Sequence, residues 1–152
     1  MRALALVFLI ACGGGSGEVE GDPLIQTTLT AEFNNKAWTP IYGFGRTKNT
    51  TFELFVGAEK ISCADDFKGT PREGHFAATG VPAPIAVGTF ASSTLNLVEV
   101  ADGNVDMQIS IGSVQITAVN AELDVSAVFA FDLTVSGARY ALNGAVTMLR
   151  CP

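Results

Sequence analysis

Residues 127–146, AVFAFDLTVSGARYALNGAV, decide the fold, because they read as two alternating strands joined by a two-residue turn at Ser136-Gly137. The predicted pairs are Val135–Ala138, Leu133–Tyr140, Phe131–Leu142, Phe129–Gly144 and Ala127–Val146. A shift of one residue would place every apolar side chain opposite a polar one, so the register is well specified. The segment therefore predicts an antiparallel hairpin with one buried face.

The chain from Leu24 onward shows the same alternation of apolar and polar residues, with Gly, Asn and Pro between the runs. No stretch after the amino-terminal segment keeps the apolar spacing of a helix over three turns. The other predicted strands are Ile25–Phe33, Lys36–Tyr42, Thr51–Ala58, a short strand near His75–Thr79, an edge strand ending at Val87–Phe90, Leu95–Ala101 and Asn104–Ile111.

Further two-residue turns are predicted at Asn34-Asn35, Asp102-Gly103 and Gly112-Ser113. The last of these places Ile109 opposite Ile116, so that five consecutive strands within residues 95–150 form an antiparallel meander. Together with the amino-terminal strands, this predicts an all-β fold. The architecture is either an antiparallel β-sandwich or a flattened β-barrel of about eight to ten strands.

Composition excludes several classes of protein. The 152 residues are 48% hydrophobic and 16% charged, with a formal net charge of -6. This length suits one domain, and the apolar fraction is too high for an intrinsically disordered chain. The acidic balance, without a cluster of Lys and Arg, argues against nucleic acid as a partner, because binding it requires neutralisation of phosphates.

The amino-terminal residues MRALALVFLIAC resemble a bacterial export signal. Arg2 precedes an apolar run, Ala3–Ala11, which is too short to cross a hydrocarbon layer about 30 Å thick but has the length of a signal-peptide core. The run ends in Leu9-Ile10-Ala11-Cys12, which resembles the lipobox of bacterial lipoproteins. The resemblance implies cleavage before Cys12 and lipidation of its thiol, and two or more acyl chains anchor a protein stably.

The residues that follow Cys12, Gly13–Gly17, are typical of a flexible tether. The predicted organisation is a lipoprotein signal peptide at 1–11, a lipidated cysteine and tether at 12–23, and a single all-β domain at 24–152. The residue after Cys12 is Gly13, not the Asp that resembles the inner-membrane retention signal of bacterial lipoproteins, so the resemblance implies the outer membrane where the cell has one. The alternative is an ordinary signal peptide cut after Ala11, which would leave Cys12 as a free thiol.

The folded part also resembles a broad class of small bacterial lipoproteins. The segments that carry the resemblance are Asn34-Asn35-Lys36-Ala37-Trp38, Val87-Gly88-Thr89-Phe90, Ile116-Thr117-x-Val119, Val125-x-x-x-Phe129-x-Phe131, Gly137 and Leu142-x-Gly144-x-Val146. The resemblance covers most of residues 24–151 and implies an all-β domain. This class has no assigned function, so the resemblance supplies no catalytic residue and no cofactor.

Two cysteines remain once Cys12 is assigned to the lipid. Export exposes Cys63 and Cys151 to an oxidising compartment, where disulfides form and persist. We therefore predict a disulfide between them, which would fasten the carboxyl terminus to the proline-interrupted region after Cys63. The alternatives are two free thiols or pairing with another chain.

Candidate metal ligands gather only at Asp65, Asp66, Glu73 and His75, but their spacing matches no familiar site. We therefore expect a solvated acidic loop here and no metal site. The segment 102–106 begins like a calcium loop, but it lacks the required Gly and Glu and is explained by a hairpin turn. The chain contains no serine-hydrolase elbow, Walker loop or dinucleotide fingerprint.

The sequence predicts the first of three functions, without an enzymatic activity or a cofactor, and leaves the other two as alternatives. The first is a lipid-anchored, non-enzymatic binding or structural module, with the membrane as one partner and an unidentified protein or small molecule as the other. The second is a lipocalin-like carrier of a small apolar ligand, which needs an open apolar cavity. The third is a secreted metal-dependent hydrolase that uses the acidic residues and His75. Trp38, Tyr42 and Phe44 could line a ligand surface, but alternation places Trp38 and Tyr42 in the core.

Overall fold

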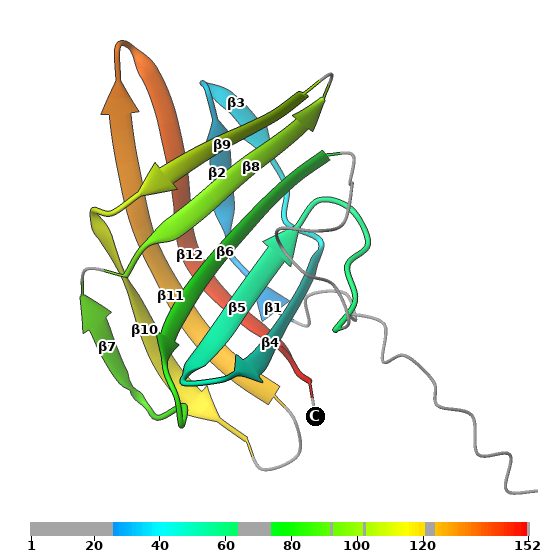
Figure 1. Cartoon of the computed structure of the whole chain (residues 1–152), viewed down its shortest axis with the longest axis vertical. Helices are drawn as coiled ribbons and strands as arrows, with labels where there is room; N and C mark the ends of the chain where they lie inside the picture. The colour runs from blue at the N-terminus through cyan, green and yellow to red at the C-terminus, as the bar shows by residue number, and fades with distance from the viewer. Residues whose placement is uncertain (1–25, 64–73, 92, 102, 121–123, 152) are drawn as a thin grey trace, which may run out of the picture.

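A computed structural model describes residues 26–63, 74–91, 93–101, 103–120 and 124–151. These residues form strands and no helix, so the described part holds no helix that could cross a membrane (Figure 1). The strands are β1 (Gln26–Thr27), β2 (Thr30–Phe33), β3 (Lys36–Trp38), β4 (Tyr42–Lys48), β5 (Thr51–Gly57), β6 (Gly74–Pro82), β7 (Gly88–Ala91), β8 (Leu95–Ala101), β9 (Gly103–Ile109), β10 (Gly112–Val119), β11 (Asp124–Val135) and β12 (Ala138–Arg150). The all-β class is confirmed.

One continuous sheet curls into a flattened half-barrel (Figure 1). Its strand order is β7-β10-β11-β12-β4-β5-β6-β8-β9, with the short strands β1 and β2 also pairing with β12 and β3 pairing with β2. Every pairing is antiparallel except that of β12 with β4, which aligns Leu149 with Phe44 and Arg150 with Gly45. This short parallel pairing joins the amino-terminal strands to the carboxyl-terminal meander.

The carboxyl-terminal hairpin has the register that the sequence predicts. β11 and β12 pair from Asp124–Leu149 through to Val135–Ala138, and Phe131 lies opposite Leu142. Ser136 and Gly137 have φ values of 52° and 82°, which is the left-handed pair that a type I′ turn requires. The meander is therefore confirmed for β10, β11 and β12.

Gly144 lies opposite Phe129 as predicted, but its role is to admit another backbone. Its φ is 120°, and a Cβ atom added there would lie 2.8 Å from the carbonyl carbon of Thr28. The amide of Thr28 donates to the carbonyl oxygen of Ala145 at 2.9 Å, and the Thr28 hydroxyl accepts from the Ala145 amide at 3.0 Å. Glycine therefore lets the amino-terminal segment cross β12 closely.

The predicted hairpin at Gly112-Ser113 is wrong. β9 pairs with β8, which places Ile109 opposite Leu95, whereas β10 pairs with β7 and β11. Ile109 and Ile116 are both fully buried, but they belong to strands that are not neighbours. Period-two alternation shows which side chains face the core but cannot show which strand lies beside which. The predicted five-strand meander is therefore wrong at the β9–β10 connection.

The β8–β9 hairpin is confirmed, although its turn is one residue shorter than predicted, because Ala101 pairs with Gly103. Asp102, at the turn itself, lies outside the described residues.

The amino-terminal strands are more broken than predicted. Asn34 and Asn35 have φ values of 52° and 63°, which confirms their turn, but the two long strands predicted around it divide into β1, β2 and β3. β4 was not predicted, because its glycines obscure the strand pattern. Gly45 is required there, since a Cβ would lie 2.6 Å from the ring of Phe52.

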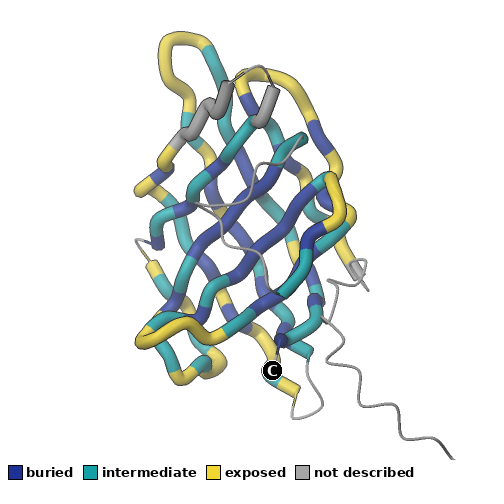
Figure 2. The backbone as a smooth tube through the Cα atoms, turned by 45° about the vertical axis from the view of Figure 1, so that its right-hand side comes forward, coloured by how far each residue is buried: buried dark blue, intermediate teal, exposed yellow. Residues whose placement is uncertain are grey.

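The main core is one cluster of buried residues from strands at both ends of the sheet order, so it lies on the concave face, and the buried stretches of these strands are dark blue in Figure 2. Among its residues with essentially no exposed surface are Phe52, Leu95, Leu97, Ile109, Ile116, Phe131, Leu142 and Met148. A second, smaller cluster lies on the opposite side of β4, β5 and β6, which is called the outer face below. It comprises Phe44, Phe55, Ile61, Ala78 and Cys151, with Tyr42 and Cys63 partly buried beside them, and is called the outer cluster.

Candidate functional site

The structure describes only some of the predicted site residues. Cys12, Asp65, Asp66 and Glu73 lie outside the described residues. His75 is described, in the second position of β6. The described residues contain no group of three or more His, Cys, Asp or Glu side chains that could hold a metal ion.

His75 packs against the sole tryptophan of the chain. Its ring stacks on that of Trp38, with a centroid separation of 5.8 Å and an interplanar angle of 14°. The Nε2 atom lies 3.4 Å from Oε1 of Glu99 but makes no hydrogen bond, and the Nζ atom of Lys36 lies 3.9 Å from the same oxygen. The described contacts of His75 therefore involve aromatic packing and one carboxylate.

The predicted disulfide between Cys63 and Cys151 is present. Their Cα atoms are 5.8 Å apart, within the range that a disulfide spans. Cys151 follows directly after β12, and its amide donates to the carbonyl oxygen of Gly45 at 2.7 Å. The bond therefore attaches the segment that follows β5 to the place where β12 meets β4.

Arg46 is the charged residue at the edge of the outer cluster. Its guanidinium lies 5.0 Å from the ring centroid of Phe55 and 5.8 Å from that of Phe44, within the range of a cation–π contact. Its Nε donates to Oε2 of Glu53 at 3.0 Å, and its Nη1 donates to the carbonyl oxygen of Cys63 at 2.9 Å. The side chain is only 13% exposed, so these partners hold it in one position.

A groove of about 770 Å³ crosses the outer face beside this cluster. Its lining includes Ala78, with a small side chain, and Gly80, with none, both on β6. Glu53 lies opposite Gly80 on one side, and Asn96 lies opposite Ala78 on the other. The groove also reaches Gln108 of β9 and residues of β7. The groove runs along β6 because the larger side chains of Glu53 and Asn96 flank these two small residues.

The groove offers polar and apolar contacts together. Phe55 and Phe90 contribute aromatic surface, and the amide of Gln108 donates to Oδ1 of Asn96 at 3.3 Å. Ser93 is buried and donates from its hydroxyl to the carbonyl oxygen of Phe90 at 3.0 Å. Neither His nor Cys is among the residues that line it. The lining can contact a ligand both by packing and by hydrogen bonds.

Trp38, Tyr42 and Phe44, which could have formed a ligand surface, pack within the protein instead. Trp38 is 9% exposed and belongs to the main core. Tyr42 and Phe44 belong to the outer cluster. The prediction that Trp38 and Tyr42 share one core face is therefore wrong for Tyr42, because residues 39–41 are not part of a strand and the alternation does not continue from β3 into β4.

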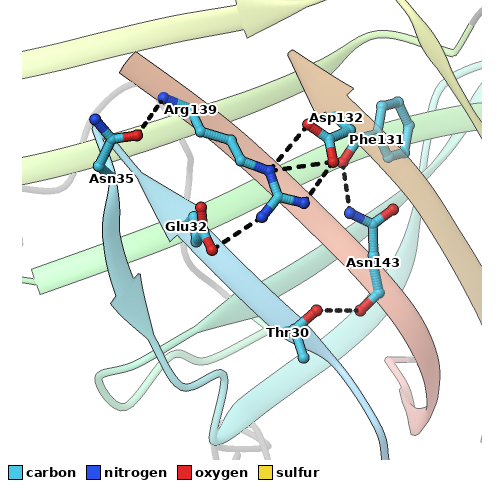
Figure 3. Close-up of polar contacts among 7 residues, drawn as sticks. All are labelled: Thr30, Glu32, Asn35, Phe131, Asp132, Arg139 and Asn143. Atoms are coloured by element: carbon cyan, nitrogen blue, oxygen red, sulfur yellow. Dashed lines mark hydrogen bonds and ion pairs between the residues drawn. The ribbon is translucent and has the colours of Figure 1, made fainter. Parts of the chain in front are cut away.

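A second polar cluster surrounds Arg139 on β12 (Figure 3). Its Nη2 atom donates to Oδ2 of Asp132 at 2.5 Å, and its Nη1 atom donates to Oε1 of Glu32 at 3.0 Å. Asp132 and Arg139 therefore form an ion pair, with Glu32 as a further partner of the guanidinium. The hydrogen bond from Arg139 lowers the pKa of Asp132, and the same contact raises that of Arg139. The guanidinium is already paired with two carboxylates from neighbouring strands. We therefore assign this cluster a structural role, which is to link β12 to β2 and β11.

Sequence reasoning missed both Arg46 and the groove. The signal for Arg46 was weak, since it stands in the glycine-rich segment GFGRTK, which was not recognised as a strand. The groove could not be predicted, because it depends on which strand lies beside β6.

Comparison with known proteins identifies no relative of this chain: no protein family, no curated protein and no solved structure matches it.

Proposed function

We propose that the chain is a lipid-anchored lipoprotein of the bacterial envelope, attached through Cys12 at the outer membrane, whose β domain is a non-enzymatic binding module. The ligand or partner occupies the groove on the outer face. The anchor rests on the lipobox-like segment before Cys12, and the tether on Gly13–Gly17.

The packing of the barrel interior is the observation that favours an outer binding site. Phe33, Phe129 and other large side chains fill the concave face, with at most 2% of each exposed. A lipocalin-like carrier needs an open apolar cavity in this position. The groove on the outer face remains accessible, and its lining is suited to recognition by packing and hydrogen bonds.

The position of the first strand is compatible with an anchor. β1 begins at Gln26, which pairs with Thr147 near the end of β12. The chain therefore enters the domain close to where it leaves it, at the end that holds the disulfide (Figure 1).

The proposed binding site can be tested with a photo-crosslinking amino acid in living bacteria. Placed at Gln108, in the groove, it is expected to give a discrete adduct that depends on ultraviolet light. Thr134, an exposed position on β11 that does not line the groove, is the control. Equal labelling from both positions, or none from Gln108, would contradict the proposal.

A further inference from the structure

We infer that the Cys63–Cys151 disulfide controls the shape of the groove, so that its reduction by a dithiol loosens one groove wall. The inference rests on the proposed binding role of the groove. It concerns regulation of that same site, and its structural part can be measured without a ligand.

The first step links the disulfide to Arg46. The carbonyl oxygen of Cys63 accepts a hydrogen bond from Nη1 of Arg46 at 2.9 Å. Ile61, two residues earlier, is 4% exposed and packs in the outer cluster. The disulfide therefore holds a short segment of chain, residues 61–63, over the outer face of the sheet.

The second step links Arg46 to the groove. Its Nε donates to the carboxylate of Glu53 at 3.0 Å, and its guanidinium lies 5.0 Å from the ring centroid of Phe55. Both residues line the groove on the β5 side. Ala78 belongs to the groove and also to the outer cluster. Arg46 thus connects the disulfide segment, residues 61–63, to the groove wall formed by Glu53 and Phe55.

The third step concerns the strand that carries Arg46. β4 meets β12 through the pairs Leu149–Phe44 and Arg150–Gly45, whereas β11 and β12 pair along their whole length. Cys151 extends the short parallel pairing, since its amide donates to the carbonyl oxygen of Gly45. Loss of the disulfide is therefore expected to act at the β12–β4 boundary, which has only two residue pairs and is separated by β4 from the groove wall on β5, and to leave the long hairpin in place.

The chemistry is ordinary thiol–disulfide exchange with a dithiol. A thiolate of the dithiol attacks the sulfur of Cys63, the more exposed of the two cysteines, and the sulfur of Cys151 leaves as a thiolate that takes up a proton. The second thiol of the reductant then attacks the mixed disulfide and releases the thiol of Cys63. Two protein thiols form, and the dithiol becomes a disulfide.

Amide hydrogen exchange tests this coupling directly in the absence of ligand. We compare the oxidised protein, the protein reduced with dithiothreitol, and the variant Cys63→Ala/Cys151→Ala. Both disulfide-free forms are expected to exchange at least about tenfold faster in β4 and β5, and this increase should exceed any increase in β11 that comes from the lower stability of the whole domain, because the units that lose contacts also open locally. Unchanged exchange in β4 and β5, or an equal increase in β11, would overturn the inference.

A variant that keeps the disulfide isolates the role of Arg46. Oxidised Arg46→Gln is expected to reproduce the faster exchange around Glu53 and Phe55. Arg139→Gln, which removes an arginine from a different cluster, is the matched control and should leave β5 unchanged. If Arg46→Gln leaves β5 protected, the proposed link through this side chain is wrong.

The experiments distinguish failure of the proposed binding site from failure of the proposed redox control. Faster exchange in β4 and β5 after reduction, without crosslinking from Gln108, would contradict the binding site and leave the redox coupling supported. Crosslinking from Gln108 that is equal in the oxidised and disulfide-free forms would support the binding site and overturn the redox control of the groove.

Discussion

Asn35 and Arg139 stand 104 positions apart in the sequence, yet they hydrogen-bond to each other through their main chains and through the amide side chain of Asn35. The Arg139 amide donates to Oδ1 of Asn35 at 2.8 Å, and the Asn35 amide donates to the carbonyl oxygen of Arg139 at 3.1 Å. The Asn35 side chain also donates to the carbonyl oxygen of Gly137 at 2.9 Å. The two hairpin turns thereby hold each other at one end of the barrel.

Substitution of Asn35 separates its two contributions. Asn35→Ala loses the side-chain hydrogen bonds. Alanine also disfavours the φ of 63° at this position, since its side chain makes no hydrogen bond that offsets the cost, so the free energy of unfolding is expected to fall by about 1–2 kcal/mol. Asn35→Gly loses the hydrogen bonds but tolerates the φ, and should fall less. Urea unfolding of the three proteins measures both effects, and equal stability of Asn35→Ala and wild type would contradict them.

The pair of Asp132 and Arg139 is expected to make stability depend on pH at acidic values. The pKa of Asp132 is lower in the folded protein than its ordinary value, mainly through the hydrogen bond from Arg139. The stabilisation is therefore fully present above the unfolded pKa of about 3.9 and is lost as the pH falls through the lower folded pKa. Both groups are exposed, so the effect is small.

Asp132→Asn provides the comparison for this pH effect. The difference in unfolding free energy between wild type and Asp132→Asn should be constant from neutral pH down to about pH 5 and should shrink at lower pH. Urea titrations across this range measure it. A difference that grows as the pH falls would show that the sign is wrong.

Gly144 should be far less replaceable than Gly88. An alanine at Gly144 overlaps the backbone of Thr28 and takes a φ of 120°, so Gly144→Ala is expected to lose about 2–4 kcal/mol of stability and to displace β1 from β12. A Cβ at Gly88 would meet nothing within 4 Å. Gly88→Ala should therefore stay within about 0.5 kcal/mol of wild type. Similar losses in both variants would refute the close-approach argument.

The disulfide is expected to stabilise the whole domain as well as the groove. It joins residues separated by 88 positions, and removal of such a bond typically costs about 2–5 kcal/mol. Cys63→Ala/Cys151→Ala should unfold at correspondingly lower denaturant concentration. Peptide mass spectrometry of the unreduced wild type should find the two cysteines linked. Recovery of both as alkylated thiols would contradict the bond.

Some strand pairings could be predicted from the sequence and others could not. The hairpin around Ser136-Gly137 was predictable in full register, because a two-residue turn fixes the pairing and alternation allows no slip. The same reasoning failed at Gly112-Ser113. There the chain passes from β9 at one end of the sheet to β10, next to β7 at the other end. Buried side chains on both strands face one core, so alternation looks alike for a hairpin and for a crossover.

The candidate site was less accessible to prediction than the fold. Cys63 and Cys151 could be paired by counting cysteines, because exported chains favour disulfides and only one pair remained. The groove depends on the alignment of Glu53 with Gly80 and of Ala78 with Asn96, which joins strands that a single sequence does not align. Arg46 acquires its role only through contacts with Cys63 and Glu53, which depend on the same arrangement.

The central claim is that Cys12 carries the lipid that holds this domain in the bacterial envelope. The most direct measurement is the intact mass of the protein purified from bacterial membranes, followed by fragmentation of its amino-terminal peptide. The account predicts that residues 1–11 are absent and that acyl groups are attached at Cys12, while Cys12→Ser is unprocessed or leaves the membrane fraction. An unmodified Cys12 in the mature protein, or a Cys12→Ser variant processed and membrane-bound like wild type, would contradict it.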